Sequence, residues 1–202
     1  MAVSKTKPLS DIMEAYSEGH RVFGENKVQE MVSKYEELPK DIQWHMIGHV
    51  QSNKIKYMAS FVSLIHGVDK FSTLKEIDKQ AKKHDRVIDC LLQARIAKEE
   101  TKYGLPLEQI EHILQSPELS ELKHVRVIGL MGMATFSRDE QLISSEFEAL
   151  HSFFDRMTGK GHALKVLSMG MSGDYKLALA HGSNMIRVGS AIFGDRNYIA
   201  SN

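Results

Sequence analysis

The chain is short of cysteine, of net charge and of long apolar runs. Its single cysteine, Cys90, cannot form an internal disulfide and lies in an apolar run typical of a buried strand, which fits a reducing compartment. The 26 Lys and Arg residues balance 26 Asp and Glu residues, so no global field favours nucleic acid or an anionic membrane surface. No apolar stretch approaches the ~20 residues of a membrane helix, and no secretory leader begins the chain. We expect a soluble cytoplasmic protein that is one domain over residues 1–202.

Short strand-like runs alternate with amphipathic helical patterns along the whole chain. The runs cover residues 1–5, 20–24, 43–48, 61–67, 87–96, 125–133, 164–169 and 185–190. Capping boxes at Thr73 and Ser137 are expected to begin two of the intervening helices. Eight strands that alternate with helices predict an α/β fold, a (β/α)8 TIM-type barrel, in which functional residues lie at the C-terminal ends of the strands.

Lys5 ends the first of these runs, shortly before Pro8. If Val3 and Lys5 share one face of the strand, the amine points inward with Val3. The lysine stem can snorkel to water, or the site can use the amine, most naturally as a Schiff base with an aldehyde cofactor. This stretch alone leaves both interpretations open.

The last two predicted strands end in residues that suit a phosphate. The run 164–169 includes Ser168, and after it the chain passes through Gly170 and Ser172 into a helix, which predicts either a phosphate site or a simple capped turn. In the last run, Gly189 and Ser190 offer backbone N–H groups that an anion can approach closely. Loops after strands seven and eight are the usual phosphate site of such a barrel.

Arg187 lies in the middle of the last apolar run, where an unpaired guanidinium is costly. One interpretation is a structural ion pair with Asp174 or Asp195. The other places the guanidinium opposite the ring nitrogen of a bound pyridine, which it would keep unprotonated. Such a site would hold pyridoxal phosphate while doing little carbanion chemistry with it.

Asn26 and two histidines also follow predicted strands. Asn26 either contacts a cofactor in the barrel mouth or caps the next helix. His45 and His49 are four residues apart, but the segment is predicted to be a strand and then a loop. Helical zinc spacing therefore does not apply, and we expect no metal site.

Six motifs follow one another along almost the whole chain. They are AVSKTKP from Ala2, FGEN from Phe23, WHMIG followed by QSNK from Trp44, GLM from Gly129, LSMGMS from Leu167 and RVGSAIFG from Arg187. In this combination and order the chain resembles the pyridoxal phosphate homeostasis protein family.

The resemblance implies a barrel similar to the N-terminal domain of bacterial alanine racemase. As a departure from the family, we expect this chain to lack the helix that usually precedes the first strand. It implies pyridoxal 5'-phosphate held as an internal aldimine on Lys5, with Ser168, Gly189 and Ser190 at the phosphate and Arg187 at the pyridine nitrogen. The implied cofactor-binding set is Lys5, Asn26, Ser168, Met169, Gly170, Arg187, Gly189 and Ser190.

The function that the resemblance implies is that of a carrier and reservoir in intracellular vitamin B6 homeostasis, without clear catalytic turnover. We expect a monomer that passes the cofactor to pyridoxal-phosphate-dependent apo-enzymes. Alanine racemase takes its second acid/base group from an additional domain, for which this chain leaves no room after strand eight. The alternatives are a low-activity amino-acid racemase and a barrel that has lost the cofactor and acts through protein partners.

Overall fold

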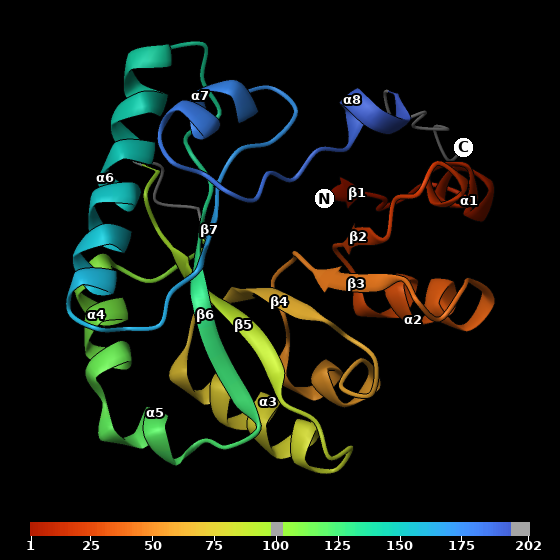
Figure 1. Cartoon of the computed structure of the whole chain (residues 1–202), viewed down its shortest axis with the longest axis horizontal. Helices are drawn as coiled ribbons and strands as arrows, with labels where there is room; N and C mark the ends of the chain where they lie inside the picture. Colours follow the sequence, from red (N-terminus) through yellow and green to blue (C-terminus); the bar gives the residue numbers. More distant parts are fainter. Residues whose placement is uncertain (98–102, 195–202) are drawn as a thin grey trace, which may run out of the picture.

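The computed structural model describes residues 1–97 and 103–194, which form a curled parallel sheet of seven strands wrapped by helices (Figure 1). The strands are β1 (Ala2–Val3), β2 (Val22–Glu25), β3 (Gln43–Met46), β4 (Leu64–Val68), β5 (Ile88–Ala94), β6 (Val125–Gly132) and β7 (Val166–Ser168). They lie side by side in the order of the sequence, and each neighbouring pair is parallel. All C-terminal strand ends therefore open at one mouth.

Helices connect the strands and cover the outside of the sheet. They are α1 (Leu9–Ser17), α2 (Val28–Glu37), the 3-10 helix η1 (Ser52–Tyr57), α3 (Phe71–Lys82), α4 (Leu107–Gln115), α5 (Pro117–Glu121), α6 (Glu140–Gly159), α7 (Tyr175–Ala180) and α8 (Ser190–Phe193). Their apolar stripes are buried, as the helical spacing predicts, with Ile77 of α3 and Phe147 of α6 fully inaccessible. Within the described ranges, no helix has the length and apolarity to cross a membrane.

Residues 185–188 close the barrel between its first and last strands. Met185 bridges Ser168 of β7, and Val188 bridges Ala2 of β1, each as an isolated parallel bridge. Figure 1 shows this segment crossing from β7 toward β1 after α7. The predicted order of eight segments is thus right, but the regular eighth strand that the sequence predicts is reduced to two bridges.

The backbone of Arg187 explains why this last segment is not a regular strand. Its N–H donates to the carbonyl of Gly170 at 2.9 Å, a residue beyond the end of β7. A ladder needs successive groups to pair with one neighbouring strand. The bond to Gly170 is out of register with the bridge between Met185 and Ser168, so the pairing with β7 stops after that bridge.

Both predicted capping boxes are wrong. Helix α3 begins at Phe71, and Thr73 is a buried residue inside it. Helix α6 is capped by Asp139, whose carboxylate accepts two N–H groups of the first turn, while the Ser137 hydroxyl accepts the N–H of Asp139. Two neighbouring side chains could cap α6, and the carboxylate, which also suits the positive helix end, does so.

Cys90 is a buried residue of β5, as predicted. Burial, with a smaller contribution from Asp89, raises the pKa of its thiol well above the usual value. The thiol is therefore a small apolar group of the core near neutral pH.

Gly129 provides a test of the strand packing. It faces Val166 across the β6–β7 pair, and an added Cβ would overlap the Val166 carbonyl. We expect Gly129→Ala to lower the free energy of unfolding by about 1–3 kcal/mol, because the two strands must separate. Urea denaturation measures this change.

The control is Gly159→Ala at the end of α6, where an added Cβ meets nothing within 4 Å. We expect it to leave stability unchanged or to raise it by up to about 1 kcal/mol, the helix propensity difference between the two residues. A Gly129→Ala protein as stable as wild type would contradict close packing of β6 on β7.

Candidate cofactor site

Lys5 lies in a turn directly after β1. The strand ends at Val3, and the N–H of Lys7 donates to the carbonyl of Ser4 at 3.0 Å to close the turn. Thr6, inside this turn, has a φ of 64°, an uncommon conformation for a β-branched residue. Val3 and Lys5 line the same cavity, as their predicted shared face requires.

This cavity, beside Lys5, has a volume of about 640 Å³ and opens at the mouth of the barrel. Five of the eight predicted cofactor-binding residues line it, namely Lys5, Asn26, Arg187, Gly189 and Ser190. Asn26 directly follows β2, while the residue that caps α2 is Lys27, which makes no side-chain capping bond. Asn26 is therefore not the cap of α2, and its contact with a cofactor stays a prediction.

Ser168, Met169 and Gly170, the other three predicted residues, do not line the cavity. The Ser168 side chain is fully buried; its hydroxyl accepts from Nη1 of Arg187 at 2.8 Å and lies 3.3 Å from Nδ1 of His66. The Met169 side chain is also inaccessible, and the carbonyl of Gly170 accepts the backbone N–H of Arg187. Ser168 and Gly170 therefore support Arg187 from the protein interior.

Ser172 lines the cavity, although the predicted set omits it. Its hydroxyl accepts the N–H of Gly189 at 3.2 Å, so the loop after β7 and the start of α8 meet there. Between the two serines, Gly170 has a φ of 93° and turns the chain. The position of Ser172 beyond this glycine, at the end of the loop, is the sequence signal that could have identified it as a cavity residue.

The guanidinium of Arg187 is buried and held by three acceptors. Nη1 donates to the carbonyl and the hydroxyl of Ser168, both at 2.8 Å, and Nη2 donates to the carbonyl of Gly132 at 2.9 Å. Burial lowers the pKa of Arg187 to about 10, while Asp174 acts to raise it, so the group is charged at neutral pH. Asp174 makes no ion pair with it, and the other predicted partner, Asp195, lies outside the described residues.

A buried row of polar groups continues from Ser168 through His66 to His45. Nε2 of His66 lies 3.1 Å from Nδ1 of His45. Burial lowers the pKa of His45 to about 4 and holds the pKa of His66 well below its usual value, so both rings are neutral at pH 7. Within residues 1–97 and 103–194, no three His, Cys, Asp or Glu side chains gather as a metal site would require.

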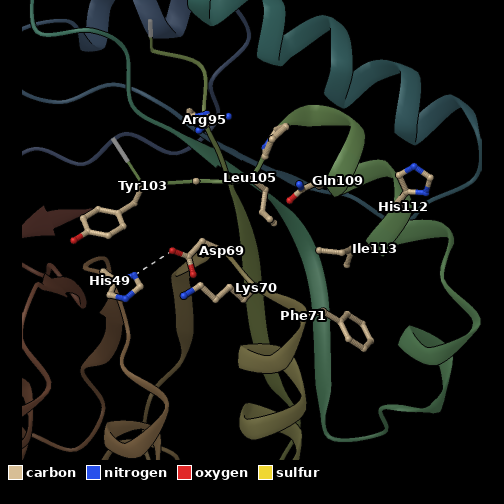
Figure 2. Close-up of a pocket in the computed structure, with 12 residues that line it drawn as sticks. His49, Asp69, Lys70, Phe71, Arg95, Tyr103, Leu105, Gln109, His112 and Ile113 are labelled. Atoms are coloured by element: carbon tan, nitrogen blue, oxygen red, sulfur yellow. Dashed lines mark ion pairs between the residues drawn. The ribbon is translucent and has the colours of Figure 1, made fainter. Parts of the chain in front are cut away.

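A second cavity, of about 780 Å³, opens near the ends of β3, β4 and β5 (Figure 2). Here Nδ1 of His49 lies 3.2 Å from Oδ2 of Asp69, and the His49 ring stacks on Tyr103 with 4.8 Å between centroids. Lys70 and Arg95 also line this cavity. None of the predicted cofactor residues does, so the smaller cavity beside Lys5 is the candidate site.

Known proteins match the chain along almost its whole length. The family model for the N-terminal domain of alanine racemase matches residues 1–197. A pyridoxal phosphate homeostasis protein of Aquifex aeolicus is 38% identical over 200 residues, which cover 98% of this chain and 87% of that protein. The chain belongs to the pyridoxal phosphate homeostasis protein family. An Escherichia coli K12 member of that family is 35% identical over 205 residues, covering 98% of this chain and 86% of the relative.

Solved structures of relatives share the fold. PipY of Synechococcus elongatus PCC7942, solved without PLP, is 36% identical with a TM-score of 0.89 over 96% of this chain and 91% of its own. The same protein with PLP bound gives a TM-score of 0.87. An alanine racemase of Clostridium difficile is 13% identical with a TM-score of 0.79, and this chain spans 53% of it, a likeness of fold alone. The family and the racemase-like fold predicted from the motifs are confirmed.

The neutral, buried His45 makes the fold of this family member sensitive to acid. In the unfolded chain His45 binds a proton near pH 6.5, but in the folded chain only near pH 4. The free energy of unfolding should therefore fall as the pH drops from about 6.5 to about 4, by up to about 1.4 kcal/mol per pH unit for this residue. Urea denaturation at a series of pH values measures the slope.

Replacing His45 with glutamine should make this slope shallower, because the side chain can no longer bind a proton. His84→Gln, at an exposed position, should leave the slope close to that of wild type. An identical slope in wild type and His45→Gln would contradict a neutral His45 in the folded protein.

Proposed function

We propose that this chain binds pyridoxal 5'-phosphate covalently through Lys5 and acts as a carrier and reservoir in vitamin B6 homeostasis. The observation that carries this proposal is that Lys5, Ser172, Arg187 and Gly189 line one cavity at the barrel mouth. Two comparisons support it: relatives are named for pyridoxal phosphate homeostasis, and the similar PipY structure is described with PLP bound.

The polar groups of the cavity fit a phosphate. The Ser172 hydroxyl accepts one hydrogen bond from Gly189 and still has its own proton to donate. The first N–H groups of a helix have no partner within it, and those of α8 begin at Ser190 beside this hydroxyl. Such N–H groups favour an anion. Ser172, Gly189 and Ser190 would therefore hold the phosphate.

Arg187 fits the ring nitrogen of a pyridine. Its guanidinium is fixed by Ser168 and Gly132, lines the cavity and keeps its charge at neutral pH. Asn26 lines the same cavity from the end of β2 and would lie beside the ring. The bound cofactor would supply an aldehyde and an electron-withdrawing ring. The fixed cation of Arg187 would keep the ring nitrogen unprotonated and so weaken the electron withdrawal by the ring.

This restraint is the reason to infer a protein that holds its cofactor rather than one that turns over an amino acid, although the fold is shared with racemases. Lys5 would retain the cofactor through a carbon–nitrogen double bond between its amine and the aldehyde carbon, and this bond is hydrolysed reversibly in water. Reversible retention suits a reservoir. We infer that the recipients are apo-enzymes that need the same cofactor, and that the carrier acts as a monomer.

The first test is the covalent bond at Lys5. Adding pyridoxal 5'-phosphate to the protein should produce a visible absorption band, and borohydride should fix the cofactor on the peptide that contains Lys5. Lys5→Ala should lose both signals, because Lys7, which also lines the cavity, donates its amine to the carbonyls of Phe193 and Gly194. The control is Lys56→Ala, an exposed lysine of η1, which should retain both. An unchanged band and label in Lys5→Ala would exclude this assignment.

The second test separates the phosphate donors from the amine. Ser172→Ala should weaken the binding of pyridoxal 5'-phosphate about tenfold or more, because a hydrogen bond to a charged group contributes about 1.5–3 kcal/mol. Binding of pyridoxal, which lacks the phosphate, should change little. Spectroscopic titration with the two aldehydes measures both, with Ser33→Ala on the exposed face of α2 as the control. Equal losses for both aldehydes would remove Ser172 from the phosphate site.

A further inference from the structure

A buried ammonium group lies behind the turn that carries Lys5. The side chain of Lys34, on α2, is 7% exposed. Its Nζ donates to the carbonyl of Ser4 at 2.8 Å, to Oε1 of Glu25 at 2.9 Å and to Oε1 of Glu30 at 2.7 Å. One cation thus joins β2, α2 and the end of β1.

The two carboxylates bound by Lys34 hold the residues on either side of Lys5. The hydroxyl of Ser4 donates to Oε1 of Glu25 at 2.5 Å. The backbone N–H of Thr6 donates to Oε1 of Glu30 at 2.6 Å. The position of the Lys5 backbone is therefore fixed from both neighbours by side chains that come from other elements.

The turn needs such support because its conformation is strained. Thr6 has a φ of 64°, which costs a β-branched residue of the order of 1–3 kcal/mol. The bond from its N–H to Glu30 compensates part of this cost. Glu30 is itself held by Lys34 four residues later in α2.

The cluster is a poor way to stabilise the fold alone. Glu25 is fully buried, and among the described residues its second oxygen, Oε2, has no hydrogen-bond partner. Burial raises the pKa of Glu25 above its usual value, although Lys34 and Ser4 act to lower it. Replacing a buried ion pair with apolar residues is often neutral or stabilising, so stability alone does not account for this cluster.

The turn is also tied to the helix that carries the phosphate donors. Nζ of Lys7 donates to the carbonyl of Phe193 at 2.6 Å and to that of Gly194 at 3.2 Å, at the end of α8. The same turn therefore lies between the Lys34 cluster and the α8 segment that includes Ser190. Its position sets the distance between the amine and the phosphate donors.

We propose that Lys34, acting through Glu25 and Glu30, is a positioning residue that places the amine of Lys5 for attack on a carbonyl carbon in the cavity. This inference rests on the proposed function. In the step concerned, the nitrogen of the neutral Lys5 amine forms a double bond to the aldehyde carbon, and the carbonyl oxygen leaves as water with the two amine protons. Lys34 touches neither reacting atom and controls the step through the backbone on both sides of Lys5.

Two probes separate this role from a general effect on the fold. Pyridoxal 5'-phosphate needs the phosphate donors and the amine, whereas pyridoxine 5'-phosphate has an alcohol in place of the aldehyde and needs the phosphate donors alone. We expect Lys34→Met to slow the appearance of the visible band by up to about 100-fold, a loss that a displacement of about 1 Å can cause. The dissociation constant of pyridoxine 5'-phosphate, measured by calorimetry, should stay within about threefold of wild type.

The matched control is Lys40→Met, an exposed lysine just beyond the same helix, which should behave as wild type with both probes. If Lys34→Met fails to fold, as judged by circular dichroism, Glu30→Gln serves instead, with exposed Glu36→Gln of α2 as its control. The amide keeps an acceptor but weakens the bonds to Lys34 and Thr6. We expect Glu30→Gln to slow band formation with pyridoxal 5'-phosphate about tenfold and to leave the dissociation constant of pyridoxine 5'-phosphate close to that of wild type.

Two results would overturn the inference alone: an unchanged rate of band formation in these variants, or a parallel loss of both probes, which would show a purely structural role. The wild-type chain provides the separate check on the proposed function. If it formed no band and bound no pyridoxine 5'-phosphate, the proposed function would fail, and this inference with it.

Discussion

The buried guanidinium of Arg187 is the interaction on which both the barrel and its site depend. It joins the carbonyl of Gly132, at the end of β6, to the carbonyl and hydroxyl of Ser168, at the end of β7. Its own backbone lies in the segment that closes the barrel onto β1. A buried cation is costly unless its donors find acceptors, and these three groups accept from Nη1 and Nη2. One residue therefore both fixes a charge in the barrel mouth and, through its backbone bond to Gly170, interrupts the pairing of the closing segment with β7.

A second buried cation, Lys34, lies on the other side of Lys5 and acts on the main chain in the same way. Arg187 binds carbonyls at the ends of β6 and β7, and Lys34 binds the carbonyl of Ser4 after β1. Each cation thus donates to main-chain carbonyls at or just after the end of a strand. The backbone beside the cavity is thus held by hydrogen bonds from two buried cations, Arg187 and Lys34. This support favours a fixed arrangement of the hydrogen-bond donors in the cavity.

The strands and Lys5 could be predicted because their signals are local: short apolar runs, and a lysine where one run ends. The choice between Ser168 and Ser172 could not be predicted, because the two serines lie close together in the sequence. Gly170, which lies between them in a left-handed conformation, turns the chain so that Ser172 reaches the cavity. Lys34 escaped notice for a different reason. A lysine four residues after a glutamate on a helix is typical of a solvated pair, and its contacts with Ser4 and Glu25, which come from elsewhere in the chain, appear only in the fold.

The row from Ser168 through His66 to His45 shows how the barrel interior tolerates the charge of Arg187. Both imidazoles are neutral at pH 7, and the nearby guanidinium is one of the causes that lower the pKa of His66, after burial and the neighbouring ring. The neutral rings offer hydrogen-bonding atoms to the Ser168 hydroxyl without adding a second positive charge. Protonation of either ring would place like charges in a dry interior, where their repulsion is poorly screened. Protonation of His66 or His45 at low pH should therefore weaken both the hydrogen bonds that hold Arg187 and the stability of the fold.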